Sequence, residues 1–493
     1  MSYEIESPAN GEAGNVAGPP KDKSYETQLQ EGHRSGDVGA QASNPPGLIG
    51  LVRQFIYDSA PHPNKDIALS GAIALLAGVT GRAYNTYTNA GLNQYILLLA
   101  STGLGKEAAA SGISKLLQAV TASVPAAGDF KGPALVSSAG LVKWLDKKPS
   151  VVTVAGECGY MLNRLASPKA NPNDQMLKAT LLDLYGKSGA GSVLDPMAYS
   201  DRDKQTGLIH SPALTLLGES VPGIVYEGLS EGVVLSGLLP RFIVIEAEGQ
   251  RAPLNEYQAT YPCPQLVQSL ADLCGNCLAL NSRNDVHVVE ADAEAKAKFR
   301  EFAQWVTDQI NGQSSEPQRE LWNRAHLKAL KLATLCAVGI NPFAPVVTIN
   351  ETMWATGLIV DQTNALIAKF ANGDVGVQAG NQSKQEREAI RVIAEYCTKP
   401  WAECSKYHGT EDMHRAGVIT QAHIQQRLSA TVAFKDDARG AKDALTRTLK
   451  SLLEADILRE IPTAQMVQMF GKHPRAFAVS DPAAILKSTK VSF

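Results

Sequence analysis

The distribution of apolar residues divides the chain into a polar beginning, an alternating middle and a largely helical remainder. Residues 1–46 are rich in Gly, Pro, Ser, Asn and charge, with almost no aliphatic clusters. They cannot bury enough surface to offset their ordering entropy, so the pattern predicts a disordered tail. Residues 47–93 are predicted to be an N-terminal helical region that contains an Ala/Leu-rich helix from Lys65 to about Gly81.

Residues 94–260 alternate short apolar runs with helical stretches, which is typical of βαβ units around a mostly parallel sheet. The runs are continuous rather than alternating, as expected of strands that are covered on both faces. The expected strands are residues 95–99, 151–154, 213–217 and 242–245. The pattern therefore predicts an α/β core with helices on both faces of the sheet.

Helical periodicity dominates residues 261–371, which are predicted to be a helical lid or sensor region. Polar residues 372–384 indicate a linker. In residues 385–493, three helices precede two short strands, at 457–461 and 476–479. This order predicts a C-terminal winged helix-turn-helix domain.

Composition and charge narrow the class of protein. With 44% hydrophobic and 19% charged residues, the composition is that of an ordinary globular protein. The net charge of −3 argues against a protein that coats DNA with a wholly basic surface. A ring that threads DNA is still compatible, because it needs only a local basic lining. Seven scattered cysteines indicate free thiols, and Cys274 and Cys277 lack the second pair that a structural zinc site normally needs. The chain shows no signal-peptide pattern and no membrane-length apolar run, so we expect no membrane contact and a cytoplasmic location.

The segment from Ala100 to Glu107 has the order of a phosphate cradle: an apolar strand, a turn with two glycines, a lysine and a helix. The glycines let backbone N–H groups approach phosphate oxygens, and the lysine bridges the terminal phosphates. A plain strand–turn–helix connection is the alternative. The predicted ATP-binding residues are Ser101, Thr102, Gly103, Leu104, Gly105, Lys106, Glu107 and Ala108.

Two further residues complete a candidate catalytic set, together with Lys106. The predicted strand 151–154 leads to Gly156-Glu157, where P-loop enzymes carry an acidic pair. Glu157 occupies the position of the carboxylate that polarises the attacking water, and a surface carboxylate is its alternative interpretation. Arg241 stands directly before a strand, where it can act as a finger on a neighbour's nucleotide or form an interdomain ion pair.

The magnesium side of this site departs from the usual pattern. Glu107 replaces the Ser or Thr that reaches Mg²⁺, Gly156 replaces the metal-holding aspartate, and Ala100 replaces the first glycine. Three possibilities remain open: Glu107 supplies the missing carboxylate, phosphates and water hold the metal, or hydrolysis is slow.

These motifs in this order resemble the phage and prophage P-loop ATPases, which are replicative-helicase-like or primase-helicase proteins. The resemblance rests on residues 101–107, 156–162, 216–222 and 237–246 and extends over about 48–370. The chain is similar, more distantly, to the AAA+ core of minichromosome-maintenance helicases. This second likeness implies that Arg324 is the second of two sensor residues in the ATP site, the arginine that touches the γ-phosphate. It also implies that the first sensor residue, at the end of a strand, is Asn or Thr. This chain has Glu219-Ser220 there instead.

We therefore expect a P-loop NTPase fold of the AAA+/RecA-like kind and an ATP-dependent, ring-forming DNA helicase or translocase of phage or mobile-element replication. ATP and Mg²⁺ are the expected cofactors, single-stranded or forked DNA the partner, a hexamer the assembly, and the bacterial host's cytoplasm the location. A replication initiator or helicase loader and a non-hydrolysing DNA-binding scaffold are the alternatives. The predicted recognition helix, 441–453, carries the candidate DNA contacts Lys442, Arg447 and Lys450, for which a solvated helix face is the alternative.

Overall fold

A computed structural model gives the fold of the chain. It describes residues 44–167, 170–196, 206–228, 234, 236–313, 315–371, 381–405, 407, 409–429, 431–435 and 440–480. Apart from its last three residues, the predicted disordered tail lies outside this range, as do residues 372–380 of the predicted linker.

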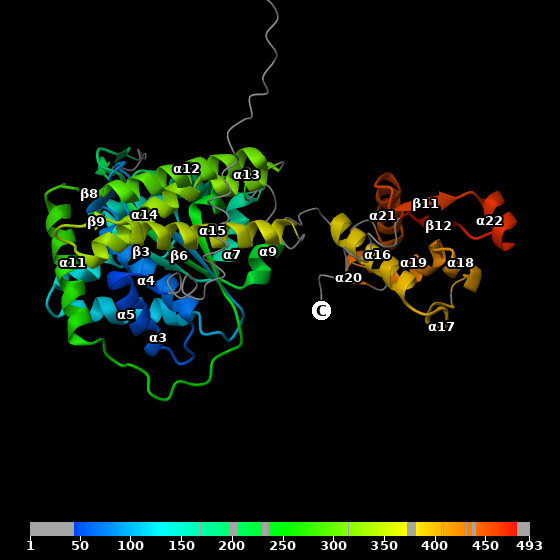
Figure 1. Cartoon of the computed structure of the whole chain (residues 1–493), viewed down its shortest axis with the longest axis horizontal. Coiled ribbons are helices and arrows are strands. Elements are labelled where there is room, and N and C mark those ends of the chain that lie inside the picture. Colours follow the sequence, from blue (N-terminus) through cyan, green and yellow to red (C-terminus); the bar gives the residue numbers. More distant parts are fainter. Residues whose placement is uncertain are drawn as a thin grey trace, which may run out of the picture. The chain divides into compact units, whose positions relative to one another are not determined.

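The main body is built on a four-stranded parallel sheet with the order β3-β6-β2-β7 (Figure 1). Its strands are β2 (Tyr95–Ala100), β3 (Ser150–Ala155), β6 (Ala213–Ser220) and β7 (Phe242–Ala247). The four strands expected from the apolar runs are thus confirmed. Because all four run in the same direction, their carboxyl ends meet at one edge, which is where α/β proteins bind ligands.

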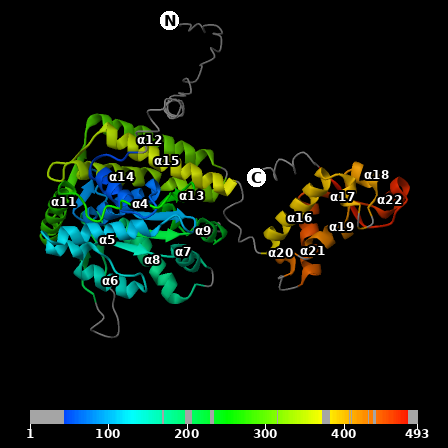
Figure 2. The ribbon, with the colours of Figure 1, turned by 90° about the horizontal axis from the view of Figure 1, so that it is seen from below.

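One face of the sheet is covered by α4 (Lys65–Thr80), a helix that the sequence predicted and that Asn64 caps through bonds from the amides of Asp66 and Ile67. Every residue from Ile67 to Thr80 is buried, because strands lie on one side of α4 and other helices on the other (Figure 2). A Cβ on Gly78 would lie 2.5 Å from the Cβ of Val152. Glycine therefore lets the helix backbone rest directly on β3.

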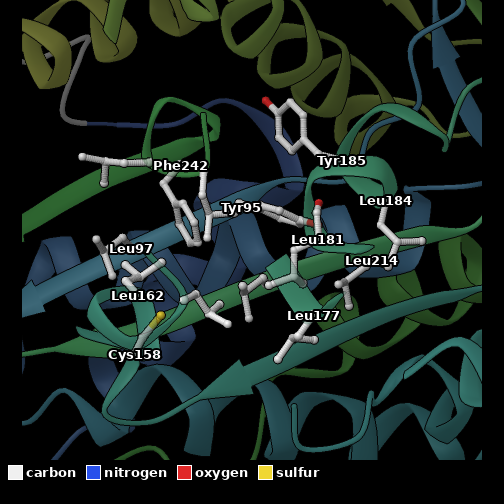
Figure 3. Close-up of a cluster of buried hydrophobic side chains, with 14 of the residues drawn as sticks. Tyr95, Leu97, Cys158, Leu162, Leu177, Leu181, Leu184, Tyr185, Leu214 and Phe242 are labelled. Carbon is white, nitrogen blue, oxygen red and sulfur yellow. The ribbon is translucent and has the colours of Figure 1, made fainter. Parts of the chain in front are cut away.

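The other face carries α7 (Cys158–Ala166) and α8 (Pro172–Gly186) over an apolar cluster (Figure 3). Leu97 of β2 and Leu214 of β6 contribute to it from the sheet, and Leu162 of α7 and Leu181 of α8 from the helices. The hydroxyl of Tyr95, buried in this cluster, donates a 2.8 Å hydrogen bond to the carbonyl of Leu181. This cluster fixes the orientation of the strands that carry the site.

The helices of residues 264–371 pack on this body. α14 contacts both α15 and α3, and α11 lies against α3, α4 and α5. Two buried lysines of α14 reach the amino ends of the strands: Lys328 Nζ donates to the Phe242 carbonyl at 3.1 Å and Lys331 Nζ to Asn93 Oδ1 at 2.8 Å. Burial lowers the pKa of Lys328 to about 8 and that of Lys331 to about 7.

The remaining elements of the main body are shorter or peripheral. A second parallel sheet has the order β1-β8-β9. The bounds are α3 (Gly47–Asp58), β1 (Tyr84–Thr86), α5 (Glu107–Thr121), η1 (Pro125–Phe130), α6 (Ser138–Lys147), β4 (Val193–Leu194), β5 (Ile209–His210), α9 (Pro222–Gly228), η3 (Leu239–Arg241), α11 (Pro264–Ser282), β8 (His287–Ala291), α12 (Ala293–Gly312), α13 (Glu316–Asn323), α14 (Ala325–Ile340), β9 (Val346–Val347) and α15 (Ile349–Ala371).

Residues 381–480 have a core of their own, formed by helices around a small antiparallel sheet with the order β10-β12-β11. The three predicted helices and both predicted strands are present. The elements that were not predicted are α17, α18, β10, α20 and α22. Because α22 lies between β11 and β12, the assignment as a winged helix stays a prediction. The bounds are α16 (Asn381–Thr398), α17 (Trp401–Cys404), α18 (Glu411–Arg415), β10 (Val418–Thr420), α19 (Gln421–Leu428), α20 (Val432–Lys435), α21 (Ala441–Glu454), β11 (Leu458–Ile461), α22 (Thr463–Phe470) and β12 (Ala476–Val479).

The described residues contain neither a cluster of three or more metal-binding side chains nor a membrane-spanning helix. Cys274 and Cys277 both lie in α11 as buried free thiols, and the described residues contain no group of three or more His, Cys, Asp or Glu side chains that could hold a metal ion. None of the helices formed by these residues is both long enough and apolar enough to span a membrane.

Candidate active site

The loop between β2 and α5 has the backbone of a phosphate cradle. Gly103 and Gly105 have φ angles of +88° and +85°, in the left-handed region that glycine adopts most readily. Lys106 caps the start of α5, so it lies where the helix dipole favours an anion. Ala100, which replaces the first glycine of the motif, is still part of β2 and fully buried. An ordinary residue therefore fits there.

Glu157 is the second residue after β3 and lies near the loop lysine. Its Oε1 lies 3.9 Å from Lys106 Nζ, and its side chain is 61% exposed. The backbone of Glu157 is left-handed, with φ +53° and ψ +34°, at the position that precedes α7. Such a conformation is strained for a residue with a Cβ and is most often kept at functional sites. The structure thus brings the two sequence-predicted residues together.

Strand β6 lies between β2 and β3 and brings a third carboxylate, that of Glu219, to the same edge. Glu219 pairs in register with Leu98, one residue before Ser220 pairs with Leu99. It is only 6% exposed, and among the described residues its Oε1 has no hydrogen-bond partner. The pKa of this carboxyl is raised to about 7, mainly by burial and also by the nearby Glu107, while Lys106 partly opposes the rise.

A cavity of about 990 Å³ opens over the loop. Six of the eight predicted ATP-binding residues line it: Thr102, Gly103, Gly105, Lys106, Glu107 and Ala108. Of the other two, Leu104 is buried in the loop and Ser101 is exposed at the end of β2. The volume is that of an ordinary small-molecule site.

The far wall of this cavity comes from two segments that are distant in sequence. The loop after α3 contributes His62 and the loop after β7 contributes Arg251. His62 Nδ1 lies 2.8 Å from the Ala252 carbonyl, its Nε2 is hydrogen-bonded to Arg251, and the Asn255 amide donates to the Pro61 carbonyl at 2.8 Å. These bonds hold a cation over the loop: Arg251 Nη1 lies 4.0 Å from where a Cβ on Gly103 would be.

The two predicted arginines lie at the opposite end of the sheet. Arg241 precedes Phe242, which pairs with Tyr95, the first residue of β2. Since β2 has six residues, this end is roughly 16 Å from the cradle. Arg324 immediately precedes α14, and its charge adds to the effect of burial in lowering the pKa of Arg241. Because α14 starts at the amino ends of the strands, Arg324 lies far from the cradle of its own chain, and its role as a sensor stays a prediction.

The guanidinium of Arg241 turns back onto its own chain instead of pointing outward. Its Nη1 donates a hydrogen bond to the Gly237 carbonyl, and its Cζ lies 5.8 Å from the centre of the Tyr185 ring. Gly237 has φ +75°, and a Cβ there would lie 3.0 Å from Arg241 Nη1. The glycine thus permits this close return. Within the described residues, Arg241 Nε is buried without a partner.

The residues at the cradle fit Mg²⁺ as a ligand. Magnesium is bound in nucleotide sites by one or two carboxylates together with phosphates and water. Glu107 offers an exposed carboxylate at the start of α5, and Glu219 offers a buried oxygen without a hydrogen-bond partner in the described part of the chain. Both are hard oxygen donors beside Lys106.

The three candidate DNA contacts of the C-terminal unit lie on α21, whose apolar face is buried against α16. Lys442 and Lys450 are exposed, and Arg447 is half-buried. Two of the three meet carboxylates of the same helix: Arg447 Nε lies 3.1 Å from Asp443, and Lys450 Nζ lies 3.7 Å from Glu454. Such exposed pairs contribute little to stability and leave the cations able to exchange partners.

Comparisons with known proteins do not show a family for this chain. No family model and no curated protein matches it. Among solved structures it is similar to a chain from the structure of Drosophila ORC bound to DNA, at 13% identity and a TM-score of 0.20, with 98% of this chain and 96% of that chain covered. At this TM-score the likeness carries no argument, and the resemblance to phage ATPases stays a prediction.

Proposed function

We propose that this protein is an ATPase that acts on DNA and that ATP binds on the loop between β2 and α5. The observation that carries the proposal is the joint placement of Gly103, Gly105, Lys106 and Glu157 around one cavity. Glycines with left-handed backbones, a lysine at a helix start and a carboxylate facing that lysine are the parts that phosphoryl transfer to water needs.

Each of these residues has a definite task in the proposed reaction. Lys106 and the amides of the loop bind the β- and γ-phosphates, and the start of α5 adds its dipole. Glu157 holds the attacking water and accepts its proton, because its carboxylate is exposed to the cavity and lies next to the lysine. Bound Mg²⁺ neutralises charge on the phosphate oxygens, and Glu107 is the ligand that the sequence suggests for it.

The active assembly in this proposal is a ring, a hexamer, with Arg241 acting on the neighbour's nucleotide. Arg241 and Arg324 share the edge of the sheet opposite the cradle, so a head-to-tail contact between copies would bring both toward a second active site. In that contact Arg241 would exchange its bond to the Gly237 carbonyl for the partner's γ-phosphate.

DNA is the proposed partner of the C-terminal unit, where Lys442, Arg447 and Lys450 would meet phosphates. The proposed activity is that of a helicase or translocase of phage or mobile-element replication. A slow ATPase that acts as an initiator or loader is the second candidate. The inward orientation of Arg241 favours it, since a guanidinium kept on its own chain supplies no transition-state charge.

The proposal is tested by ATP binding and ATP turnover in Lys106→Ala. Charged hydrogen bonds contribute ~1.5–3 kcal/mol, so nucleotide affinity should fall about 10- to 100-fold. Lys147→Ala, which removes an exposed lysine of α6, is the matched control and should bind normally. Turnover should rise when single-stranded DNA is added to the native chain. A native chain that binds no nucleotide in calorimetry with Mg²⁺ would refute the proposal.

A further inference from the structure

A buried carboxylate, that of Glu219, lies at the phosphate end of the sheet. Glu219 is 6% exposed, and its Oε1 makes no hydrogen bond within the described residues. By contrast, Glu246, the penultimate residue of β7 on the other side of β2, accepts a 2.6 Å hydrogen bond from the Tyr226 hydroxyl and lies 3.6 Å from Lys369 Nζ. Two strands beside the cradle thus carry a glutamate as their penultimate residue, and within the described residues the one on β6 has an oxygen without a hydrogen bond.

A buried carboxylate oxygen without a hydrogen bond costs free energy, and proteins normally keep one only where a ligand binds it. The charged neighbours of Glu219 are Glu107 and Lys106. Lys106 is also the residue that binds phosphates in the proposed function. When Lys106 binds a nucleotide, Glu219 would share this cation with the phosphates, while the negative charge of Glu107 stays nearby.

We propose that Glu219 and Glu107 together form the Mg²⁺ site that serves the nucleotide. This inference rests on the proposed ATPase function and names the metal ligands of that same site. One carboxylate comes from the start of α5 and the other from the end of β6, the strand adjacent to β2. Two carboxylates, phosphate oxygens and water are a donor set that magnesium accepts.

The same pair explains why two usual ligands are absent. Glu107 stands where Ser or Thr would be, and Gly156 stands where β3 would offer an aspartate. β6 is the direct neighbour of β2, whereas β3 is one strand further away. A carboxylate at the end of β6 is therefore nearer the cradle and replaces the one missing from β3.

A different role for Glu219 would be that of a neutral sensor, a protonated carboxyl that donates a hydrogen bond to the γ-phosphate. Glu219→Gln distinguishes the two roles, because glutamine keeps the shape and the donor but is a poor magnesium ligand. If Glu219 is a sensor, glutamine should preserve Mg²⁺-dependent binding. If Glu219 is a ligand, that dependence should be lost.

The experiment measures ADP and ATP affinity by calorimetry in the full chain, once with Mg²⁺ and once with EDTA. In the native chain Mg²⁺ should tighten ATP binding about tenfold or more, a difference of ~1.4 kcal/mol. In Glu219→Gln and in Glu107→Gln this ratio should fall to about 1–2, while affinity in EDTA stays the same or rises because a charge that repels phosphate is gone. Glu246→Gln is the matched control and should keep the native ratio.

A second measurement uses Mn²⁺ in place of Mg²⁺ and follows its electron paramagnetic resonance in the presence of ADP. The native chain and Glu246→Gln should immobilise Mn²⁺, and both cradle variants should leave it free. Because Glu107 is exposed, Glu107→Gln carries the test even if Glu219→Gln unfolds. A native Mg²⁺ ratio in Glu107→Gln, or in folded Glu219→Gln, overturns the inference and leaves the ATPase proposal standing. A native chain that binds no nucleotide in either buffer overturns both.

Discussion

Replacing Glu157 by glycine is expected to stabilise the fold while abolishing ATP turnover. Glu157 has φ +53°, and left-handed backbone costs a residue with a Cβ ~1–2 kcal/mol. Glycine adopts this conformation without that cost but loses more chain entropy on folding, by ~0.5–1 kcal/mol. The net gain is about 0.5–1 kcal/mol. Loss of the pair with Lys106 should subtract little, because its atoms lie 3.9 Å apart and the glutamate is 61% exposed, which puts the pair at the low end of the ~0–1 kcal/mol of surface pairs.

The assay is urea unfolding of three variants, Glu157→Gly, Glu157→Ala and Glu157→Gln, each also tested for ATP binding and turnover. All three remove the carboxylate and should lower turnover by about 10²–10⁴-fold, the usual contribution of a general base. Only glycine removes the Cβ, so only Glu157→Gly should unfold at a higher urea concentration. Equal midpoints for glycine and alanine would refute the argument from strain, and native turnover in Glu157→Gln would refute the catalytic role.

Two further outcomes are expected. Arg241→Ala should bind ATP normally but hydrolyse it at least about 10³-fold more slowly. Mixing it with Glu157→Gln should recover activity, because some interfaces then combine an intact Glu157 with an intact Arg241. Mixtures that stay inactive would contradict action in trans. Lys442→Ala and Lys450→Ala should each weaken DNA binding and reduce the slope of log affinity against log salt concentration by about 0.9 for duplex DNA. Binding titrations at several salt concentrations measure this slope. Unchanged slopes would show that α21 does not contact DNA.

The main elements of the fold could be predicted from residue patterns because they depend on local sequence. Continuous apolar runs marked β2, β3, β6 and β7, and an Ala/Leu-rich stretch marked α4. The strand order could not be predicted, since nothing in the runs says that β6 lies between β2 and β3. The helix α22 was missed because residues 463–470 follow a strand signal and precede another, where a hairpin loop is the simpler expectation.

The cradle was predictable for a similar reason, because Gly103, Gly105 and Lys106 are adjacent in sequence. His62 and Arg251 were missed because the two loops that carry them meet only in the fold. Glu219 could be read only as a departure from a sensor, since its burial depends on neighbouring strands. The orientation of Arg241 could not be predicted either, because it depends on the left-handed backbone of Gly237, which permits the guanidinium to return to its own chain.

The complete burial of α4 has a consequence for how the protein is made. Residues 67–80 leave the ribosome before the four strands that cover them. The first of these, β2, begins soon afterwards at Tyr95, but the last, β7, ends only at Ala247. At ~5–20 residues per second, an apolar helix without a polar face waits on the order of ten seconds for its partners. During that interval the nascent chain presents a surface that chaperones bind. Expression should therefore depend on chaperone supply and growth temperature more than the stability of the finished protein would suggest.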